Sequence, residues 1–322
     1  MKKLFQMLPI VVLAGSLCFV GCQKENTTAG TVVPVTETLK LQNVKEENGV
    51  LRFESLEHLT ASLKFVEKNQ KSLVWLATQF PNFTSSQNAY MSFSDADLIK
   101  TNGDMTTFND YVTIVSHENE KYAEPTVDAY LVSLLTSKNG LILVGDNVYK
   151  FTYDNVFTFN QQYLSDFLSK KVEVGNIPNV VVFPIKRNII YDNQDRASAV
   201  SPRWNFDWCE NQYLSKRKMN GVISTTNVGF WTDVDATTKH QVKGFLGIWG
   251  LVSVPQLETI GTVGIADNTS FGVVAVDKRG NNVSKISQGA GNAGNWDIVS
   301  SDTRHIAIVN QFGETHECNL IR

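Results

Sequence analysis

The chain has 322 residues, of which 42% are hydrophobic, 10% are aromatic and 19% are charged, and its formal net charge is −3. This composition excludes a largely disordered chain, and the slight acidic excess argues against nucleic-acid binding, for which a basic surface is expected. The length exceeds what one hydrophobic core usually holds, so two domains are expected.

Residues 1–21 have the three parts of a secretory signal. Lys2 and Lys3 form a cationic start, an almost wholly apolar stretch follows, and Gly21 stands directly before Cys22. A small residue before a cysteine indicates a lipoprotein signal, in which the Cys22 thiol carries a diacylglycerol. The alternative is a membrane-spanning helix, but about 17 apolar residues interrupted by Pro9 are at the lower limit for crossing a bilayer. We therefore predict cleavage after residue 21 and a lipid anchor at Cys22.

The residues that follow the cysteine carry a first resemblance. Cys22-Gln23-Lys24-Glu25-Asn26 resembles the start of lipoproteins from Bacteroidetes, in which a lysine and an acidic residue soon after the cysteine accompany surface display. The resemblance implies a lipoprotein of the cell envelope, in the outer membrane and exposed at the surface.

Cleavage leaves 27 basic and 32 acidic residues, because residues 1–21 contain two lysines and no acids. The expected partners are thus the membrane, through the lipid, and no nucleic acid.

The front half of the mature chain is predicted to be a mixed α+β domain. Residues 22–45 lack apolar periodicity and are expected to be a flexible tether, and residues 46–190 are expected to fold. Ser55 is a typical N-cap for a helix that continues to about Thr78. The other predicted elements are strands at Val50–Phe53, Leu141–Val144, Val148–Tyr153 and a buried one at Val180–Phe183, and helices at Thr106–Val115, Val127–Leu135 and Gln161–Ser169.

Short motifs in this region carry a second resemblance. Phe53-Glu54-Ser55-Leu56-Glu57, Tyr130 to Leu135 and Gly145-Asp146-Asn147-Val148-Tyr149-Lys150 resemble a group of uncharacterised Bacteroidetes lipoproteins with a helical front and a Gly-Asp-x-x-Tyr-Lys hairpin. The resemblance covers residues 45–160. It implies an envelope lipoprotein of unknown function and supplies no activity and no catalytic residues.

The last part of the chain is predicted to be all β. Residues 191–203 are polar and are expected to be a linker, and residues 204–322 contain short alternating runs typical of a β-sandwich. These runs are Gly221–Ser224, Val228–Trp231, Val242–Trp249, Thr262–Ile265, Gly272–Val276, Val283–Ile286 and Ile306–Val309, with a turn at Asp277–Asn282. The predicted fold class is α+β, with an α+β domain in front and a sandwich-like domain behind.

No catalytic, metal or cofactor site is predicted from motifs. Gly289–Gly294 matches the dinucleotide-binding fingerprint, but no helix is expected after it, so a loop is the simpler interpretation. Ser215–Lys218 fits Ser-x-x-Lys without the partner motifs of penicillin-recognising enzymes. Asp233 and Asp235 lack the pattern of a calcium loop.

Two cysteines remain in the predicted folded part. Cys209 and Cys318 form an even pair in an oxidising compartment, which favours a disulfide. The alternative is a pair of free buried thiols.

The tryptophans are concentrated in the predicted β domain. Trp204, Trp231, Trp249 and Trp296 are candidates for stacking on sugar rings, as in carbohydrate-binding sandwiches, whereas the more common role of such residues is core packing. The favoured hypothesis is a non-catalytic module that binds a glycan or a surface protein. The alternatives are a structural or adhesive, pilus-like component and a glycan-active hydrolase with clustered carboxylates such as Asp207, Glu210 and Asp233.

Overall fold

The computed structural model describes residues 39–70, 73–117, 119–187, 206–267, 269–310 and 312–321. Cys22, Trp204, the predicted signal, most of the tether and the whole predicted linker lie outside these residues. From Leu39 onward the chain forms one compact unit. No described helix has the length and apolar character needed to cross a bilayer.

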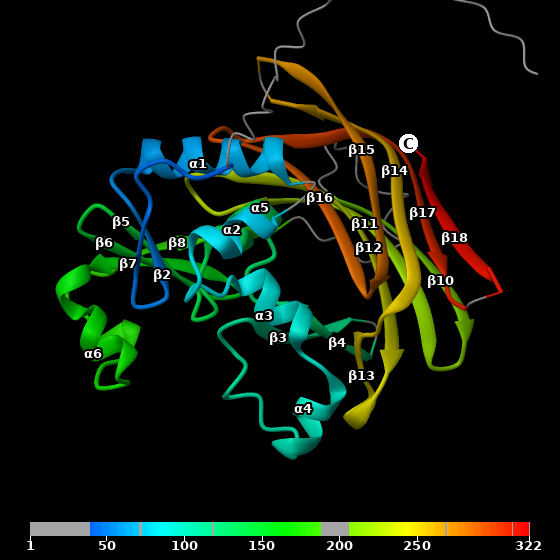
Figure 1. Ribbon diagram of the computed structural model, residues 1–322, viewed down its shortest axis with the longest axis horizontal. Helices are drawn as coiled ribbons and strands as arrows, with labels where there is room; N and C mark the ends of the chain where they lie inside the picture. Colours follow the sequence, from blue (N-terminus) through cyan, green and yellow to red (C-terminus); the bar gives the residue numbers. More distant parts are fainter. Residues whose placement is uncertain are drawn as a thin grey trace, which may run out of the picture. The chain divides into compact units, whose positions relative to one another are not determined.

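Strands dominate the described residues and form three sheets (Figure 1). The first sheet has six strands in the order β1 (Lys45–Glu47), β2 (Val50–Phe53), β5 (Leu141–Val144), β6 (Asn147–Phe151), β7 (Asn155–Asn160) and β8 (Val181–Pro184). The second contains β10 (Phe206–Leu214), β11 (Arg217–Asn227), β12 (Thr232–Lys243), β13 (Ile248–Leu251), β4 (Glu120–Pro125) and β3 (Val112–His117), with β16 (Lys285–Asn292) beside β12 and β9 (Lys186–Arg187) beside β11. The third has the order β15 (Phe271–Val283), β14 (Val254–Ala266), β17 (Asp297–Ile308) and β18 (Thr315–Ile321).

The helices are short and come mainly from the front of the chain. They are α1 (Leu56–Asn69), α2 (Val74–Gln79), α3 (Ser86–Ser92), α4 (Asp95–Lys100), α5 (Tyr130–Leu135) and α6 (Leu164–Leu168), with 3₁₀ turns at Gln161–Tyr163, Val174–Asn176 and Phe245–Gly247. The Ser55 side chain caps α1 by accepting a hydrogen bond from the His58 backbone N–H at 3.2 Å. Leu59, Leu63 and Val66 share one face of α1 and are fully buried.

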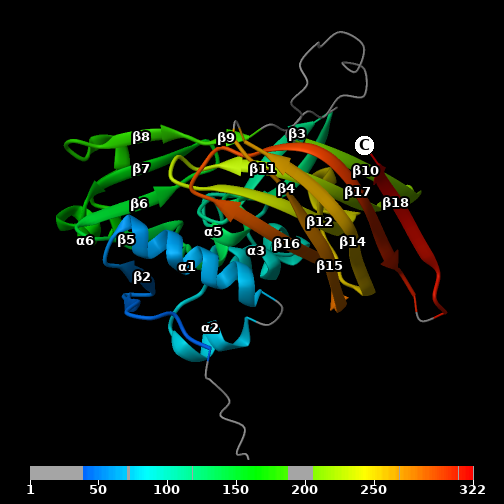
Figure 2. The same cartoon turned by 90° about the horizontal axis from the view of Figure 1, so that it is seen from above.

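The end of α1 covers the outer edge of β16. The Gln70 side-chain amide donates to the Gly289 carbonyl at 2.7 Å, and its oxygen accepts from the Gly289 N–H at 3.0 Å. Figure 2 shows α1 lying beside β16. One side chain therefore satisfies the backbone groups of Gly289 that the β12 ladder leaves free.

The second and third sheets pack face to face as a β-sandwich. Ile223 of β11 and Val234 of β12 belong to one buried cluster with Val263 of β14 and Val276 of β15. Because side chains alternate along a strand, the neighbouring residues of β11 and β12 point to the opposite face of the second sheet. That opposite face holds the cavity described below.

The predicted division at residues 191–203 does not separate the two halves. β4 pairs in parallel with β13, with Lys121 opposite Ile248 and Tyr122 opposite Trp249. β9 pairs with β11 across the same predicted boundary. The second sheet thus takes strands from both sides of that boundary.

Several predicted elements differ from those observed. Thr106–Val115 is not a helix: turns precede β3, because Val112 and its β-branched neighbours pair with β4. Val228–Trp231 is the turn between β11 and β12, where Gly229 has a φ of +91°. Asp277–Asn282 belongs to β15, which pairs with β14 along its length. The strand near Val180 is an exposed edge strand, β8, and not a buried one.

Candidate ligand-binding cavity

Polar residues gather on the face of β11, β12 and β16 that turns away from the third sheet. In the strand register, Asp235 of β12 lies opposite Ser224 of β11. Four residues further along β12, Lys239 lies between Asn220 of β11 and Lys285 of β16. The period of two in these strands therefore places carboxylate, amide and amine groups on one surface.

A cavity lies over this polar face. The volume of this cavity that the centre of a water molecule can reach is about 80 Å³, which is several times the volume that one water needs. The other walls are formed by β4, by the segment that leads into α5, and by Tyr153. The charged, amide and aromatic residues of the lining are Tyr122, Glu124, Asp128, Tyr130, Tyr153, Asn220, Asp235, Lys239 and Lys285.

Two buried aspartates of β12 position the wall that α5 provides. Asp233 accepts hydrogen bonds from the backbone N–H of Leu131 at 2.8 Å and from that of Val132 at 3.4 Å. Asp235 accepts one from the N–H of Tyr130 at 3.1 Å. The first N–H groups of a helix have no partner inside it, so these carboxylates fix α5 to the sheet.

The two carboxyl groups do not carry equal charge. Burial raises the pKa of both, and the charge of Asp233 raises the pKa of Asp235 further. Asp233 also accepts a hydrogen bond from Trp231 Nε1 at 2.6 Å, and donors of this kind favour the ionised form. Asp233 is therefore the first of the pair to ionise, and Asp235 retains its proton to higher pH.

Most charges at the cavity are paired. Lys239 pairs with Glu124, and Arg187 of β9 pairs with Asp128. Lys285 is different: it is 8% exposed, and the described part of the protein offers its Nζ no hydrogen bond and no ion pair. Burial, together with the facing Lys239, lowers the pKa of Lys285 to about 8.

Three oxygen atoms of the lining also have no partner among the described residues. They are Asp128 Oδ1, Asn220 Oδ1 and Asp235 Oδ1. Their sister atoms are engaged, since Asn220 Nδ2 donates to Gln241 at 2.7 Å. A buried polar atom without a partner costs free energy, and several around one cavity are typical of a site that a polar ligand completes.

Two of the predicted stacking tryptophans are core residues. Trp231 is 1% exposed and Trp249 is 0% exposed, so neither ring offers a face to a ligand. Trp296 is partly buried against the sandwich core, with Lys64 Nζ 5.6 Å from its ring centre. Burial excludes Trp231 and Trp249 as ligand-stacking residues, and Trp204 lies outside the described residues.

An ion network around the buried Lys218 explains the position of Trp249. Its Nε1 donates to Glu120 at 2.9 Å, and the Lys218 Nζ lies 4.2 Å from its ring centre. Lys218 pairs with Glu120 at 3.3 Å and with Glu210 at 3.0 Å. Lys218 is thus a buried residue that is paired with two carboxylates.

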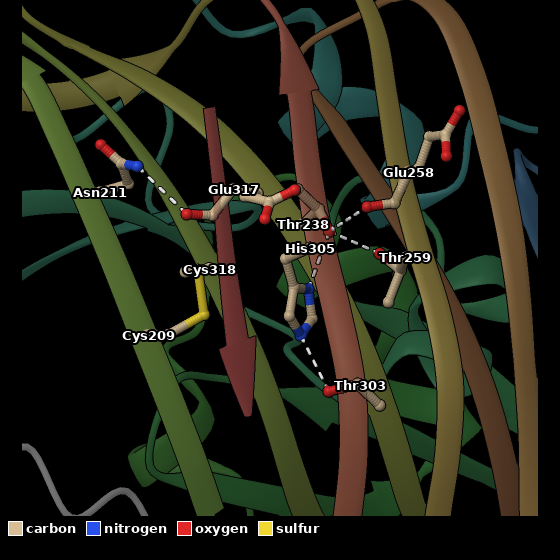
Figure 3. Close-up of a disulfide and its surroundings, with 9 residues drawn as sticks. All are labelled: Cys209, Asn211, Thr238, Glu258, Thr259, Thr303, His305, Glu317 and Cys318. Atoms are coloured by element: carbon tan, nitrogen blue, oxygen red, sulfur yellow. Dashed lines mark hydrogen bonds between the residues drawn. A yellow bond between two sulfur atoms is a disulfide. The ribbon is translucent and has the colours of Figure 1, made fainter. Parts of the chain in front are cut away.

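The edge of the sandwich between β10 and β18 is closed by a disulfide. Cys209 and Cys318 are bonded, with their Cα atoms 5.8 Å apart (Figure 3). Beside them, the imidazole of His305 lies between Thr238 at 2.9 Å and Thr303 at 3.1 Å. A Cβ on Gly221 would lie 2.3 Å from the His305 ring and 2.8 Å from Cys209 Sγ, so only glycine fits there.

The carboxylates suggested for a hydrolase do not converge. Glu210 lies opposite Asn220, whereas Asp233 lies opposite Thr226, six residues further along β11. That separation is about 20 Å along the strand, well beyond the spacing of a glycosidase pair. The side chain of Asp207 lies outside the described ones.

Gly289–Gly294 begins as a strand rather than as a loop. Gly289 and Gly291 are in β16, where a Cβ would lie 2.7 Å from Asp235 Oδ1 and 2.3 Å from the Trp231 ring, respectively. Close packing therefore accounts for these two glycines. The described residues contain no group of three or more His, Cys, Asp or Glu side chains suited to a metal ion.

Sequence reasoning missed most of the cavity. Asp235 drew attention only as a weak calcium candidate, and Glu124, Asp128 and Lys285 were not singled out. The available signal was the sequence Thr-Asp-Val-Asp-Ala-Thr-Thr-Lys of residues 232–239. If this segment is a strand, every residue on one of its faces, at positions 233, 235, 237 and 239, is polar.

Comparison with known proteins adds little. No protein-family model matches the chain, and no curated protein matches it significantly. One solved structure, of a DUF4848 family protein from Bacteroides thetaiotaomicron VPI-5482, has 11% sequence identity and a TM-score of 0.27, over 86% of this chain and 100% of that one. A likeness at that score carries no argument about fold or function.

Proposed function

We propose that this protein is a lipid-anchored protein of the cell envelope whose cavity binds the hydroxyl-bearing edge of a sugar residue, without catalysis. The observation that carries the proposal is one cavity lined by Asp128, Asn220 and Asp235, each of which has an Oδ1 atom without a partner among the described residues. A sugar hydroxyl both donates and accepts hydrogen bonds. A sugar hydroxyl can therefore donate to the Asp235 carboxylate or accept from the protonated Asp235 carboxyl group. An ammonium group of a ligand could only donate.

The lining also contains aromatic surface suited to a sugar ring. Tyr122, Tyr130 and Tyr153 all contribute to the cavity. Apolar and aromatic walls with a few placed polar groups are typical of small-molecule sites. The proposed site is thus the polar face of the second sheet, and not a tryptophan strip.

Calorimetric titration with a panel of neutral monosaccharides and their uronic acids tests the binding. We expect the full chain, purified in detergent, to bind at least one sugar, and Ser224→Phe, which fills the cavity from β11, to abolish that binding. Ser253→Phe, at an exposed position between β13 and β14, is the matched control and should bind normally. Retained binding in Ser224→Phe would place the sugar elsewhere, and no binding by the wild type would overturn the proposal.

The anchor has its own test. In the proposed scheme Cys22 carries the lipid, so Cys22→Ser should abolish metabolic labelling with a palmitate analogue and release the chain from the membrane fraction. Cys18→Ser, inside the predicted signal, is the control. Unchanged labelling of Cys22→Ser would contradict the lipoprotein assignment.

A further inference from the structure

Lys285 is the one cavity cation that the described residues leave without an ion-pair partner. Its side chain is 8% exposed and reaches the cavity from β16, directly opposite Lys239 of β12. Lys239 is neutralised by Glu124, whereas no carboxylate oxygen of the described residues is within ion-pair distance of the Lys285 Nζ. Burying a charge without an ion-pair partner is unfavourable, so this amine is suited to an anionic group that arrives with the ligand.

The other charged groups of the lining face Lys285 without forming an ion pair with it. Glu124 and Asp128 are each engaged by another cation, Lys239 and Arg187, respectively. The charge of Asp233 is held by N–H donors at the start of α5 and by Trp231. Together with Arg187, the lining has three cations and three carboxyl groups, and among these cations only Lys285 has no ion pair with a described residue.

We infer that the cavity binds an acidic sugar, with the carboxylate of a uronic acid placed against the Lys285 Nζ and the ring hydroxyls placed against the unpartnered oxygens of Asp128, Asn220 and Asp235. This inference rests on the proposed sugar-binding function and names its ligand class. A carboxylate accepts strong, charge-assisted hydrogen bonds from an ammonium group. The hydroxyl at the same position of a neutral sugar gains only an ordinary hydrogen bond.

The matched ligands are D-glucuronic acid and D-glucose, or the corresponding pair for whichever neutral sugar binds. By calorimetry at pH 7 we expect the uronic acid to bind at least tenfold more tightly than the neutral sugar. In Lys285→Gln the two ligands should bind equally, while Lys45→Gln, at an exposed position on β1, should keep the preference. Thermal unfolding of each variant establishes that the comparison is made on folded protein.

A second measurement needs no variant. The charged groups that face Lys285 are Glu124 on β4, Asp128, and Asp235 and Lys239 on β12, with the Tyr90 ring of α3 at 5.1 Å. Because burial lowers the pKa of Lys285 to about 8, the uronic acid preference should fall as pH rises from 7 to 9 and the amine loses its proton. The fall should persist in Asp235→Asn and disappear in Lys285→Gln, which assigns it to the lysine.

The outcomes separate the two proposals. Equal binding of the uronic acid and the neutral sugar by the wild type would overturn the acidic-sugar inference and leave sugar binding standing. A preference that survives in Lys285→Gln would overturn the role of the lysine. Failure of both ligand classes to bind would overturn sugar binding itself.

Discussion

At the residue scale, the sandwich interior contains an uncharged histidine. His305 is fully buried, and its ring nitrogens contact the hydroxyl groups of Thr238 and Thr303. Burial lowers the pKa of His305 to about 4, below its ordinary value of 6.5. At a pH between 4 and 6.5, His305 is therefore neutral in the folded protein and protonated in the unfolded chain.

His305 should make the protein sensitive to acid. Between pH 6.5 and 4 the unfolded state binds one more proton than the folded state, so stability falls as pH falls, by about 3 kcal/mol at the acid end. Urea unfolding of wild type and His305→Gln across this range should give curves that diverge toward low pH. Asp233, whose pKa is raised, shifts both curves in the opposite sense and cancels in the comparison. Parallel curves would contradict the prediction.

At the element scale, α5 depends on contacts from a distant strand. Its six residues are all buried. Its N-cap residue, Ala129, has no side-chain group that could accept a hydrogen bond from the first turn. Isolated helices this short are not stable in water. The cap instead comes from Asp233 and Asp235 of β12, so the second sheet stabilises a wall of its own cavity.

Removing one of these caps should be costly. Asp233→Ala leaves the N–H groups of Leu131 and Trp231 buried without an acceptor, and we expect a loss of about 3 kcal/mol in the free energy of unfolding. Asp97→Ala is the control, because Asp97 caps the more exposed helix α4 and should cost about 1 kcal/mol. Chemical denaturation measures both, and equal losses would show that burial of the α5 cap is unimportant.

At the scale of the whole molecule, the chain is held together by long-range pairings. β4 and β9 from the front of the sequence join strands from the back in the second sheet. The disulfide then joins β10 of that sheet to β18 of the third, across a sequence separation of 109 residues. The sandwich is thus closed covalently at one edge.

Opening this disulfide should destabilise the whole fold. In the chain-entropy description, a cross-link closing a loop of this length stabilises by about 4 to 5 kcal/mol. Cys209→Ala/Cys318→Ala should therefore unfold at a clearly lower guanidinium concentration than the wild type. A reductant should lower the wild-type midpoint and leave that of the double variant unchanged; an unaffected wild-type midpoint would contradict the prediction.

Local signals in the sequence predicted some of the local structure correctly. Ser55 begins α1 as predicted, and the strand at Leu141–Val144 has the predicted bounds, because capping and turn residues act on their immediate neighbours. The helix predicted to continue to about Thr78 instead ends at Asn69 and is followed by α2. The β-rich texture of the last part of the chain likewise indicated strands. The helix predicted at Thr106–Val115 is wrong, because pairing with β4 overrides the helical pattern and local propensity does not reveal that pairing.

The candidate site was decided by tertiary structure alone. Composition and spacing do not show that Asn220, Lys239 and Lys285 share one row of a sheet, since strand register is set by pairings between distant residues. Nor do they show which tryptophans are buried. From the sequence alone, the starts of α1 and β5 and the two cysteines available for a disulfide can be predicted, because these depend on neighbouring residues. The folded chain decided which charges are paired, which polar atoms are left without partners and where a ligand has room, because these depend on what packs against each side chain.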